Sequence, residues 1–232
     1  MSMYRFFSSL FVFCVLPAFG VQAELPPALE QAVTHAERFE GDRFAFTLSL
    51  ETGDGAYVAT FDPRLPENAR WSLMSPPLEA LSADEKKAYD ALVQDNTADE
   101  DLVYANLRHV IGDDVAVVSE TGAEVVYGFT VIEEEKDDVR IASPHIRGEA
   151  TLLREGAYIS KVRYFAPKPF KPNAAAKVER LDIIQTYAPL FPDGPVVNIE
   201  TVSEVSGKAL FRSFEERSST VYSNVSQVDV ED

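Results

Sequence analysis

Cysteine is nearly absent from this sequence: Cys14 is the single thiol in 232 residues, beside one tryptophan and three histidines. One cysteine excludes an intrachain disulfide framework and a cysteine-rich zinc site, because both need several thiols. Basic residues are also scarce, since 21 Lys and Arg stand against 38 Asp and Glu and leave a formal net charge of −17. Nucleic-acid binding needs clustered Lys and Arg on the surface, so we expect no nucleic-acid partner.

Hydrophobic residues, in contrast, are plentiful. They make up 46% of the chain, and aromatic residues alone make up 11%. This composition excludes an intrinsically disordered protein, which combines high charge with low hydrophobicity. A chain of this length can bury enough apolar surface to be stabilised by its core alone.

Residues 1–23 have the pattern of a secretory signal peptide. Arg5 precedes an apolar run, and the stretch ends in small residues at Ala23, after which we expect cleavage. The run is shorter than the ~20 residues of a membrane span, and Pro17 interrupts it. We therefore expect an exported, periplasmic protein without a permanent membrane anchor, whose residues 24–232 form a single domain. Cys14 lies inside the leader, too early for a lipoprotein signal, so the exported domain is expected to have no thiol.

Three segments have the pattern of helices. The first begins at Pro26-Pro27, where a missing N–H costs little, and is expected to end at Gly41. The second begins at Ser82, which with Glu85 fits a capping box. The third is expected over 98–110, where apolar residues recur at helical spacing. The acidic residues 99–101 would lie at its start, where negative charge suits the helix dipole.

Alternation of apolar and polar residues predicts strands in the remainder. It is clearest over 42–51, where Phe44, Phe46 and Leu48 share one face. Short gaps that contain glycine indicate hairpins, whereas the charged residues 133–138 are expected to form a solvated turn. The expected strands cover 42–51, 56–61, 70–74, 115–119, 124–132, 148–154, 157–165, 178–187, 196–205, 208–215 and 219–225.

Local antiparallel pairs of this kind make a meander rather than βαβ units. A sheet of eight or more strands must curl or close. We therefore expect a β-rich α+β fold: a single large curved antiparallel sheet, a half-barrel, with a few helices covering its concave face.

A search for catalytic and metal-binding motifs finds none. The sequence has no Gly-x-Ser-x-Gly elbow and no phosphate-binding glycine loop. His35, His109 and His145 do not have metal-ligand spacing, and the acidic clusters do not match a calcium-binding loop. We therefore expect no catalytic residues, no metal, no cofactor and no enzymatic activity. A hydrolase that uses two carboxylates stays open as a minor alternative, because the separation of such a pair is spatial.

The aromatic residues are the most informative group, because most of them lie on expected strands. Most should be core, yet the concave face of a curved sheet can also keep a hollow for an apolar ligand. The ligand-binding candidates on this ground are Phe44, Phe46, Leu48, Trp71, Tyr127 and Phe129.

The stretch Tyr57-Val58-Ala59-Thr60-Phe61-Asp62-Pro63, followed by Arg70-Trp71-Ser72-Leu73, resembles a stretch of uncharacterised exported bacterial proteins. In its order of leader, helix, strands, helical insert and hairpins, the chain is similar to the LolA/LolB-like half-barrel superfamily. The motif itself covers about 18 residues, whereas the similar layout covers most of 24–225. The resemblance implies a periplasmic half-barrel that carries or senses lipids or lipoproteins.

Our leading hypothesis is a periplasmic binding protein whose partner is a hydrophobic ligand or the acyl chains of a lipoprotein. The alternative is an interaction module without a small ligand, which binds another envelope protein through its acidic surface or a sheet edge.

Overall fold

The computed structural model describes residues 25–230, apart from 54, 96, 113, 137–138 and 211. The expected leader 1–23 and its Cys14 lie outside the described residues, so export and cleavage after Ala23 stay predictions. Among the described residues, no helix is long and apolar enough to cross a membrane.

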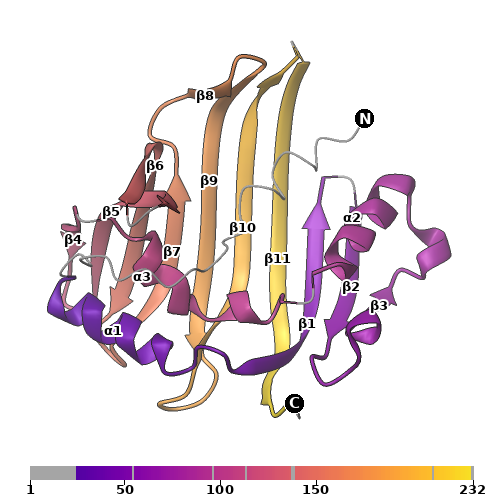
Figure 1. Cartoon of the computed structure of the whole chain (residues 1–232), viewed down its shortest axis with the longest axis horizontal. Helices are drawn as coiled ribbons and strands as arrows, with labels where there is room; N and C mark the ends of the chain where they lie inside the picture. The colour runs from indigo at the N-terminus through magenta and orange to yellow at the C-terminus, as the bar shows by residue number, and fades with distance from the viewer. Residues whose placement is uncertain are drawn as a thin grey trace.

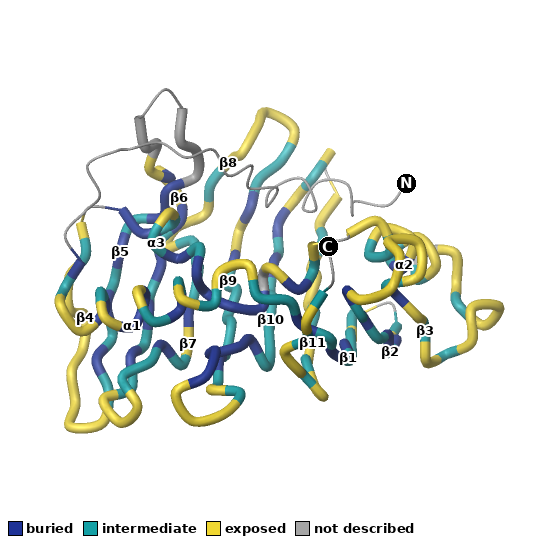
Figure 2. The backbone as a smooth tube through the Cα atoms, turned by 60° about the horizontal axis from the view of Figure 1, so that its bottom comes forward, coloured by how far each residue is buried: buried dark blue, intermediate teal, exposed yellow. Residues whose placement is uncertain are grey.

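One antiparallel sheet runs through the described part of the chain and contains 11 strands (Figure 1). The sheet is open and curved, with the helical segments on its concave face, as the sequence predicts (Figures 1 and 2). Its order from edge to edge is β3 (Trp71–Ser75), β2 (Gly55–Phe61), β1 (Arg43–Thr52), β11 (Arg212–Val228), β10 (Val196–Ala209), β9 (Ala176–Pro189), β7 (Tyr158–Phe165), β6 (Val139–Leu153), β5 (Glu124–Lys136) and β4 (Ala116–Glu120), with β8 (Phe170–Asn173) paired to β9.

The expected strands at the N-terminal side are confirmed, because alternation is a local property that survives folding. In β1, Phe44, Phe46 and Leu48 are buried while the residues between them are partly exposed. The return strand β2 pairs with β1 in register from Thr52↔Gly55 to Phe46↔Phe61. The short β3 follows with Trp71 buried opposite Phe61.

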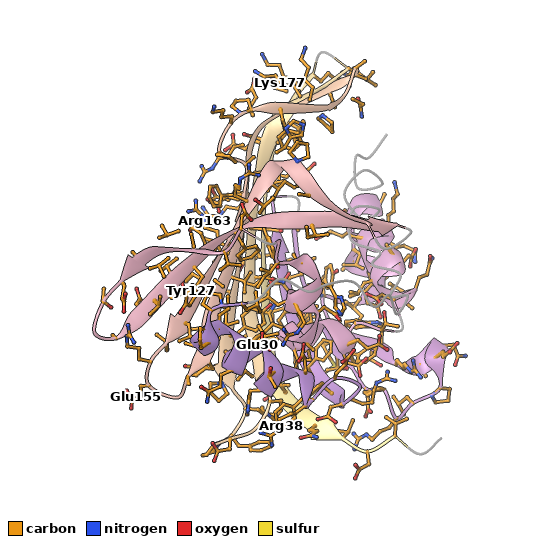
Figure 3. All side chains as sticks on the ribbon, turned by 60° about the vertical axis from the view of Figure 1, so that its left-hand side comes forward. Glu30, Arg38, Tyr127, Glu155, Arg163 and Lys177 are labelled. Carbon is orange, nitrogen blue, oxygen red and sulfur yellow. The ribbon has the colours of Figure 1, made fainter. Side chains whose placement is uncertain are left out.

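The C-terminal strands differ from the prediction. Instead of separate strands over 208–215 and 219–225, β10 continues to Ala209 and β11 is one strand of 17 residues. The charged and polar residues at 215–219 look like a break, but their backbone groups pair with β10, for example Arg217 with Glu204. The chain turns at Leu210 instead, whose N–H donates to the Ala175 carbonyl at 3.0 Å. Figure 3 shows Lys177 near this end of the long strands and Arg38 at the opposite end.

Two further differences concern where strands end and how many there are. The expected turn over 133–138 is wrong, because β5 and β6 continue until Lys136 pairs with Val139. The strand β8, in a segment with several prolines, was not expected. It pairs with β9 alone among the described strands, and such a position tolerates proline since one side of the strand needs no partner.

The helices confirm two of the three expectations. The helix α1 (Pro27–Glu37) begins as predicted and buries Leu29, Val33 and Ala36, but it ends four residues before Gly41, which lies in the following turn with φ +85°. The helix α2 (Ala83–Val93) has the complete capping box, with Ser82 and Glu85 each accepting from the backbone N–H of the other.

The expected helix over 98–110 is wrong. Three short pieces replace it: η4 (Glu100–Leu102), η5 (Tyr104–Asn106) and α3 (Leu107–Val110). Val103 between them is extended and forms an isolated antiparallel bridge with Val197 of β10. Tertiary pairing to the sheet has therefore replaced continuous helical hydrogen bonding at this residue. The remaining short turns are η2 (Glu67–Ala69) and η3 (Leu78–Ala80).

The face of the sheet opposite the helices has a row of ion pairs that crosses five neighbouring strands. Adjacent partners are 2.7–4.0 Å apart, and charges of opposite sign alternate, which favours the observed register. From β6 to β11 the row contains Glu149, Arg163, Asp182, Arg180, Glu204 and Arg217.

We predict that Phe44→Ala lowers the free energy of unfolding by about 3–5 kcal/mol, since it would leave a cavity in a closely packed core. Phe44 has no exposed surface, whereas Met74 on β3 is 64% exposed. Met74→Ala is therefore the control, with an expected change below about 0.5 kcal/mol. Urea denaturation measures both, and equal losses would show that Phe44 is not a core residue in solution.

Candidate ligand-binding face

Two large apolar clusters form the concave face, and the six candidate residues divide between them. Phe44, Phe46, Leu48 and Trp71 belong to a cluster on β1, β2 and β3, under α2 and η4. Tyr127 and Phe129 belong to a second cluster on β5, β6 and β7, under α1 and α3. All six side chains are buried. The sequence thus identified one face of the sheet, but these residues do not form one continuous lining.

The first cluster is built around Phe46, whose ring stacks on Phe61 and meets Trp71 and Tyr222 edge-on. The Phe46 ring centroid lies 5.3 Å from that of Phe61, 5.7 Å from that of Trp71 and 5.5 Å from that of Tyr222. The Trp71 indole N–H donates to the Asp95 carbonyl at 2.9 Å. The apolar rings of Trp71 therefore pack in the cluster, while its indole N–H is held by the backbone at Asp95, which lies between α2 and the crossing segment.

In the second cluster, Phe129 lies directly over a glycine. A Cβ built on Gly148 would stand 2.1 Å from the Phe129 ring, so only glycine fits at this position of β6. The ring also meets Tyr164 edge-on, with centroids 6.5 Å apart. Burial raises the pKa of the Tyr164 phenol, because its ionised form would be poorly solvated there.

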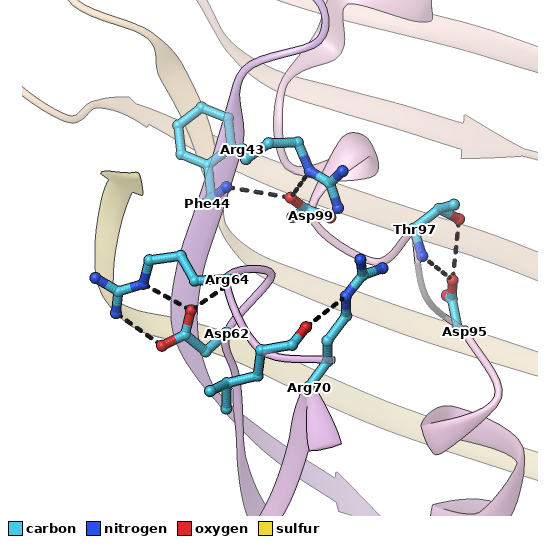
Figure 4. A network of polar contacts seen from close by, with 9 residues as sticks. Arg43, Phe44, Asp62, Arg64, Arg70, Asp95, Thr97 and Asp99 are labelled. Carbon is cyan, nitrogen blue, oxygen red and sulfur yellow. Dashed lines mark hydrogen bonds and ion pairs between the residues drawn. The ribbon is translucent and has the colours of Figure 1, made fainter. Parts of the chain in front are cut away.

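Residues 97–112, here called the crossing segment, run over the concave face from one cluster to the other (Figure 1). Near its start, Asp99 is fully buried. This carboxylate accepts from Arg43 Nε at 2.6 Å, from Arg43 Nη2 at 3.1 Å and from the Phe44 backbone N–H at 3.2 Å (Figure 4). The interpretation of Asp99 as a helix-start charge is therefore wrong, because it is the ion-pair partner of β1.

The middle and the end of the crossing segment are attached to other elements. The Tyr104 hydroxyl accepts from the Ile159 N–H at 3.3 Å, and burial raises the pKa of this phenol to about 12. Arg108 donates to the carboxylates of Glu30 and Glu37 on α1 at 2.5–3.2 Å. Ile111 forms a bridge to Val131 of β5, so the segment spans the width of the face.

A buried amide lies next to the point where the crossing segment pairs with β10. Asn198 is 3% exposed, and its Nδ2 donates to the Thr201 hydroxyl at 2.8 Å. Its Oδ1 has no hydrogen-bond partner among the described residues. Reversing the amide would leave the nitrogen unpartnered instead, so one buried polar atom of Asn198 lacks a partner in either orientation.

An open hollow of about 520 Å³ lies beside the first cluster, at the end of the sheet where β9 turns into β10. Its apolar lining comes from Leu190, Phe191 and Val225, and its polar lining includes Gln227 and Asp229. Leu190 and Val225 also pack against the first cluster, so the hollow adjoins the buried aromatic rings. Its volume is within the range of small-molecule sites.

The histidines have structural contacts in this arrangement. His35 Nε2 lies 3.1 Å from the Gly194 carbonyl, and the His145 ring stacks on Phe170 with centroids 4.7 Å apart. Within the described part of the chain, no group of three or more His, Cys, Asp or Glu residues is placed to hold a metal ion.

Sequence reasoning missed the residues that attach the crossing segment to the sheet. Asp99 and Arg43 are 56 positions apart, and Arg108 and Glu30 are 78 apart. In an acidic chain, nothing in the local pattern separates the buried Asp99 from Glu100, which is exposed. Asn198 could have been noticed only as a polar residue directly after the apolar pair Val196-Val197.

No family model matches the sequence, and no curated protein matches it. Among solved structures, the chain is similar to a DUF1329 family protein from Desulfovibrio piger. The TM-score is 0.33 and the identity 8%, over 88% of this chain and 94% of that chain. A likeness at this level assigns neither a family nor a function, and the resemblance to the LolA/LolB-like superfamily stays a prediction.

We predict that Asp99→Asn lowers the free energy of unfolding by about 2–3 kcal/mol, because Arg43 would lose its buried counter-charge. The matched control is Asp62→Asn, which removes an ion pair to Arg64 on the surface and should cost below about 1 kcal/mol. Urea denaturation measures both. A loss no larger for Asp99→Asn than for the control would mean that the crossing segment does not depend on this pair.

Acid should loosen the attachment of α1 before the sheet unfolds. Hydrogen bonds from Arg108 hold the pKa of Glu30 below its usual value of 4.5. A carboxyl whose pKa is lowered by folding stabilises the folded state above its unfolded pKa, and this contribution is lost as the pH falls through the folded pKa. We therefore expect hydrogen exchange of α1 and α3, corrected for the intrinsic pH dependence, to rise below pH 4.5. Arg108→Gln should abolish this additional pH dependence. The prediction would be contradicted if the variant showed the same rise in exchange below pH 4.5 as the parent protein.

Proposed function

We propose that this chain is a periplasmic binding protein that carries or senses the acyl chain of a lipid or lipoprotein, held on the concave face under the crossing segment. The observation that carries the proposal is the way in which the concave face is covered. An aromatic-rich face of an open sheet is covered by short helical pieces and by the crossing segment, which bridges to the sheet at Val103 and Ile111. An apolar ligand that replaced this cover would remove apolar area from water at about 25 cal/mol per Å².

The gate in this proposal is the crossing segment. Between Asp99 and Arg108 it has no continuous helix, and its backbone pairs with β10 at Val103. Leu102, Ala105 and Leu107 are buried in the two clusters, so opening the gate requires an apolar ligand that takes over their contacts with the sheet. The hollow beside Leu190 and Val225 would then be the entrance to the first cluster.

The unpartnered end of Asn198 suggests how a ligand would be oriented. A buried acceptor without a donor is costly, and a ligand hydroxyl, amide or protonated carboxyl would satisfy it. We therefore propose that the polar end of the ligand lies near Asn198 and that its apolar chain lies along the first cluster. In this proposal the ligand lies next to the point where Val103 pairs with β10.

A reversible disulfide across the crossing segment tests the gate. Val103 and Val197 are antiparallel bridge partners, a geometry within the reach of a disulfide. In a Cys14→Ser background, we expect the oxidised variant Val103→Cys/Val197→Cys to lose at least tenfold in affinity for a fluorescent fatty acid. Reduction should restore the affinity of the Cys14→Ser parent.

The matched control is Val202→Cys/Ser219→Cys, which joins register partners of β10 and β11 away from the crossing segment. Its affinity should not depend on oxidation. Saturable binding that is the same in both redox states of the first variant would contradict the gate. An absence of saturable binding to the Cys14→Ser parent would contradict the proposed function and favour the alternative of an interaction module.

A further inference from the structure

One end of the sheet has a charge opposite to that of the whole chain. Residues 166–178 and 205–214 contain five basic residues and no Asp or Glu, in a protein whose net charge is −17. The rest of the chain therefore has a net charge of −22. The basic residues of this end, here called the basic tip, are Lys168, Lys171, Lys177, Lys208 and Arg212.

The fold brings these two stretches together. They form the β8–β9 and β10–β11 hairpins, whose ends lie side by side at the top of Figure 1. Lys177 and Lys208 are directly opposite each other in the register of β9 and β10. Like charges in that position repel each other. No described residue forms an ion pair with Lys171, Lys208 or Arg212, whereas Lys177 is paired with Glu179 at 3.3 Å.

A large apolar side chain projects from the same place. Leu210 is 70% exposed, the most exposed large hydrophobic residue among those described. Its φ of +48° is in the left-handed region, which favours glycine and is unfavourable for leucine. The turn would thus be more stable with glycine, and neither packing nor backbone geometry accounts for the leucine. Basic residues stand two positions before it and two positions after it.

The basic tip is rigid enough to present these side chains together. Phe214 packs over Gly207, where a Cβ would stand 2.9 Å from the ring and 2.2 Å from the Lys177 carbonyl. Phe170 and Phe214 pack against a small buried cluster formed by Val178, Leu181 and Val205. The hydrogen bond from Leu210 N–H to the Ala175 carbonyl joins the two hairpin ends.

We propose that the basic tip docks on the surface of a bilayer that contains anionic lipids, with Lys208 and Arg212 at the headgroups and Leu210 inserted below them. Clustered Lys and Arg are attracted to an anionic bilayer, and an exposed apolar side chain between them gains by entering its interface. The strongly acidic remainder is repelled from the same surface, so the molecule would approach with its tip first. An exposed leucine favours a lipid surface over a nucleic acid, which would offer it no apolar environment.

This inference does not depend on the proposed binding of an acyl chain. The tip lies at the end of the sheet opposite the β9–β10 turn and its hollow, and its residues are not among the six candidates. Each of the two proposals can therefore fail while the other holds.

Flotation with lipid vesicles tests the docking. We expect the full chain to bind vesicles of phosphatidylglycerol and phosphatidylcholine more tightly than vesicles of phosphatidylcholine alone, and salt should weaken this preference. Lys208→Glu/Arg212→Glu should reduce the affinity for the anionic vesicles by roughly tenfold or more, because each basic residue near such a surface contributes several-fold. The matched control is Lys86→Glu/Lys87→Glu on α2, which makes the same change in charge away from the tip and should bind like the parent.

Leu210→Gly separates insertion from folding. Because glycine suits the left-handed turn, the melting temperature should stay the same or rise, while binding to the anionic vesicles should fall several-fold. Residues 1–23 are identical in every variant, so differences between variants report the tip. Equal losses for the tip variant and the α2 control would overturn the proposal, as would unchanged binding of Leu210→Gly. Binding to heparin but not to vesicles would overturn it too and would indicate a polyanion site.

Discussion

The buried carboxylate of Asp99 is the contact on which the arrangement of the concave face depends. It accepts from both nitrogens of one edge of the Arg43 guanidinium and from the Phe44 backbone, and so joins the crossing segment to the first strand of the sheet. A buried charge is tolerated only where its partner and its hydrogen bonds are in place. This attachment fixes the start of the segment beside the first cluster, from which Val103 pairs with β10, while Tyr104, Arg108 and Ile111 attach the rest.

The two faces of the sheet are stabilised by different interactions. The concave face is apolar over β1–β3 and β5–β7, and it needs a cover because aromatic side chains there would otherwise meet water. The opposite face has an alternating row of ion pairs and stays solvated. Both proposals rest on this division: the proposed ligand site lies on the concave face, and the proposed membrane contact lies on the long hairpins, which extend beyond the cover.

Residues with local signals were predictable, and those with distant partners were not. Ser82 and Glu85 cap α2 because both halves of the motif lie within four residues, and Phe44, Phe46 and Leu48 share a face because strands have a period of two. The segment 98–110 has helical spacing, yet Val103 adopts an extended conformation because β10 offers it a backbone partner. Likewise, the charged residues 215–217 form part of a strand because a neighbouring strand pairs with them.

The sequence by itself determined the class of fold and the face of the sheet that is apolar, because the alternation of apolar and polar residues is a local property of the chain. Only the tertiary structure decided that the six candidate residues divide between two clusters, that Asp99 is buried against Arg43, and that Asn198 retains an unpartnered atom. The reason is separation along the chain. A contact between residues more than 50 positions apart depends on the path of every segment between them, and no local pattern records that path.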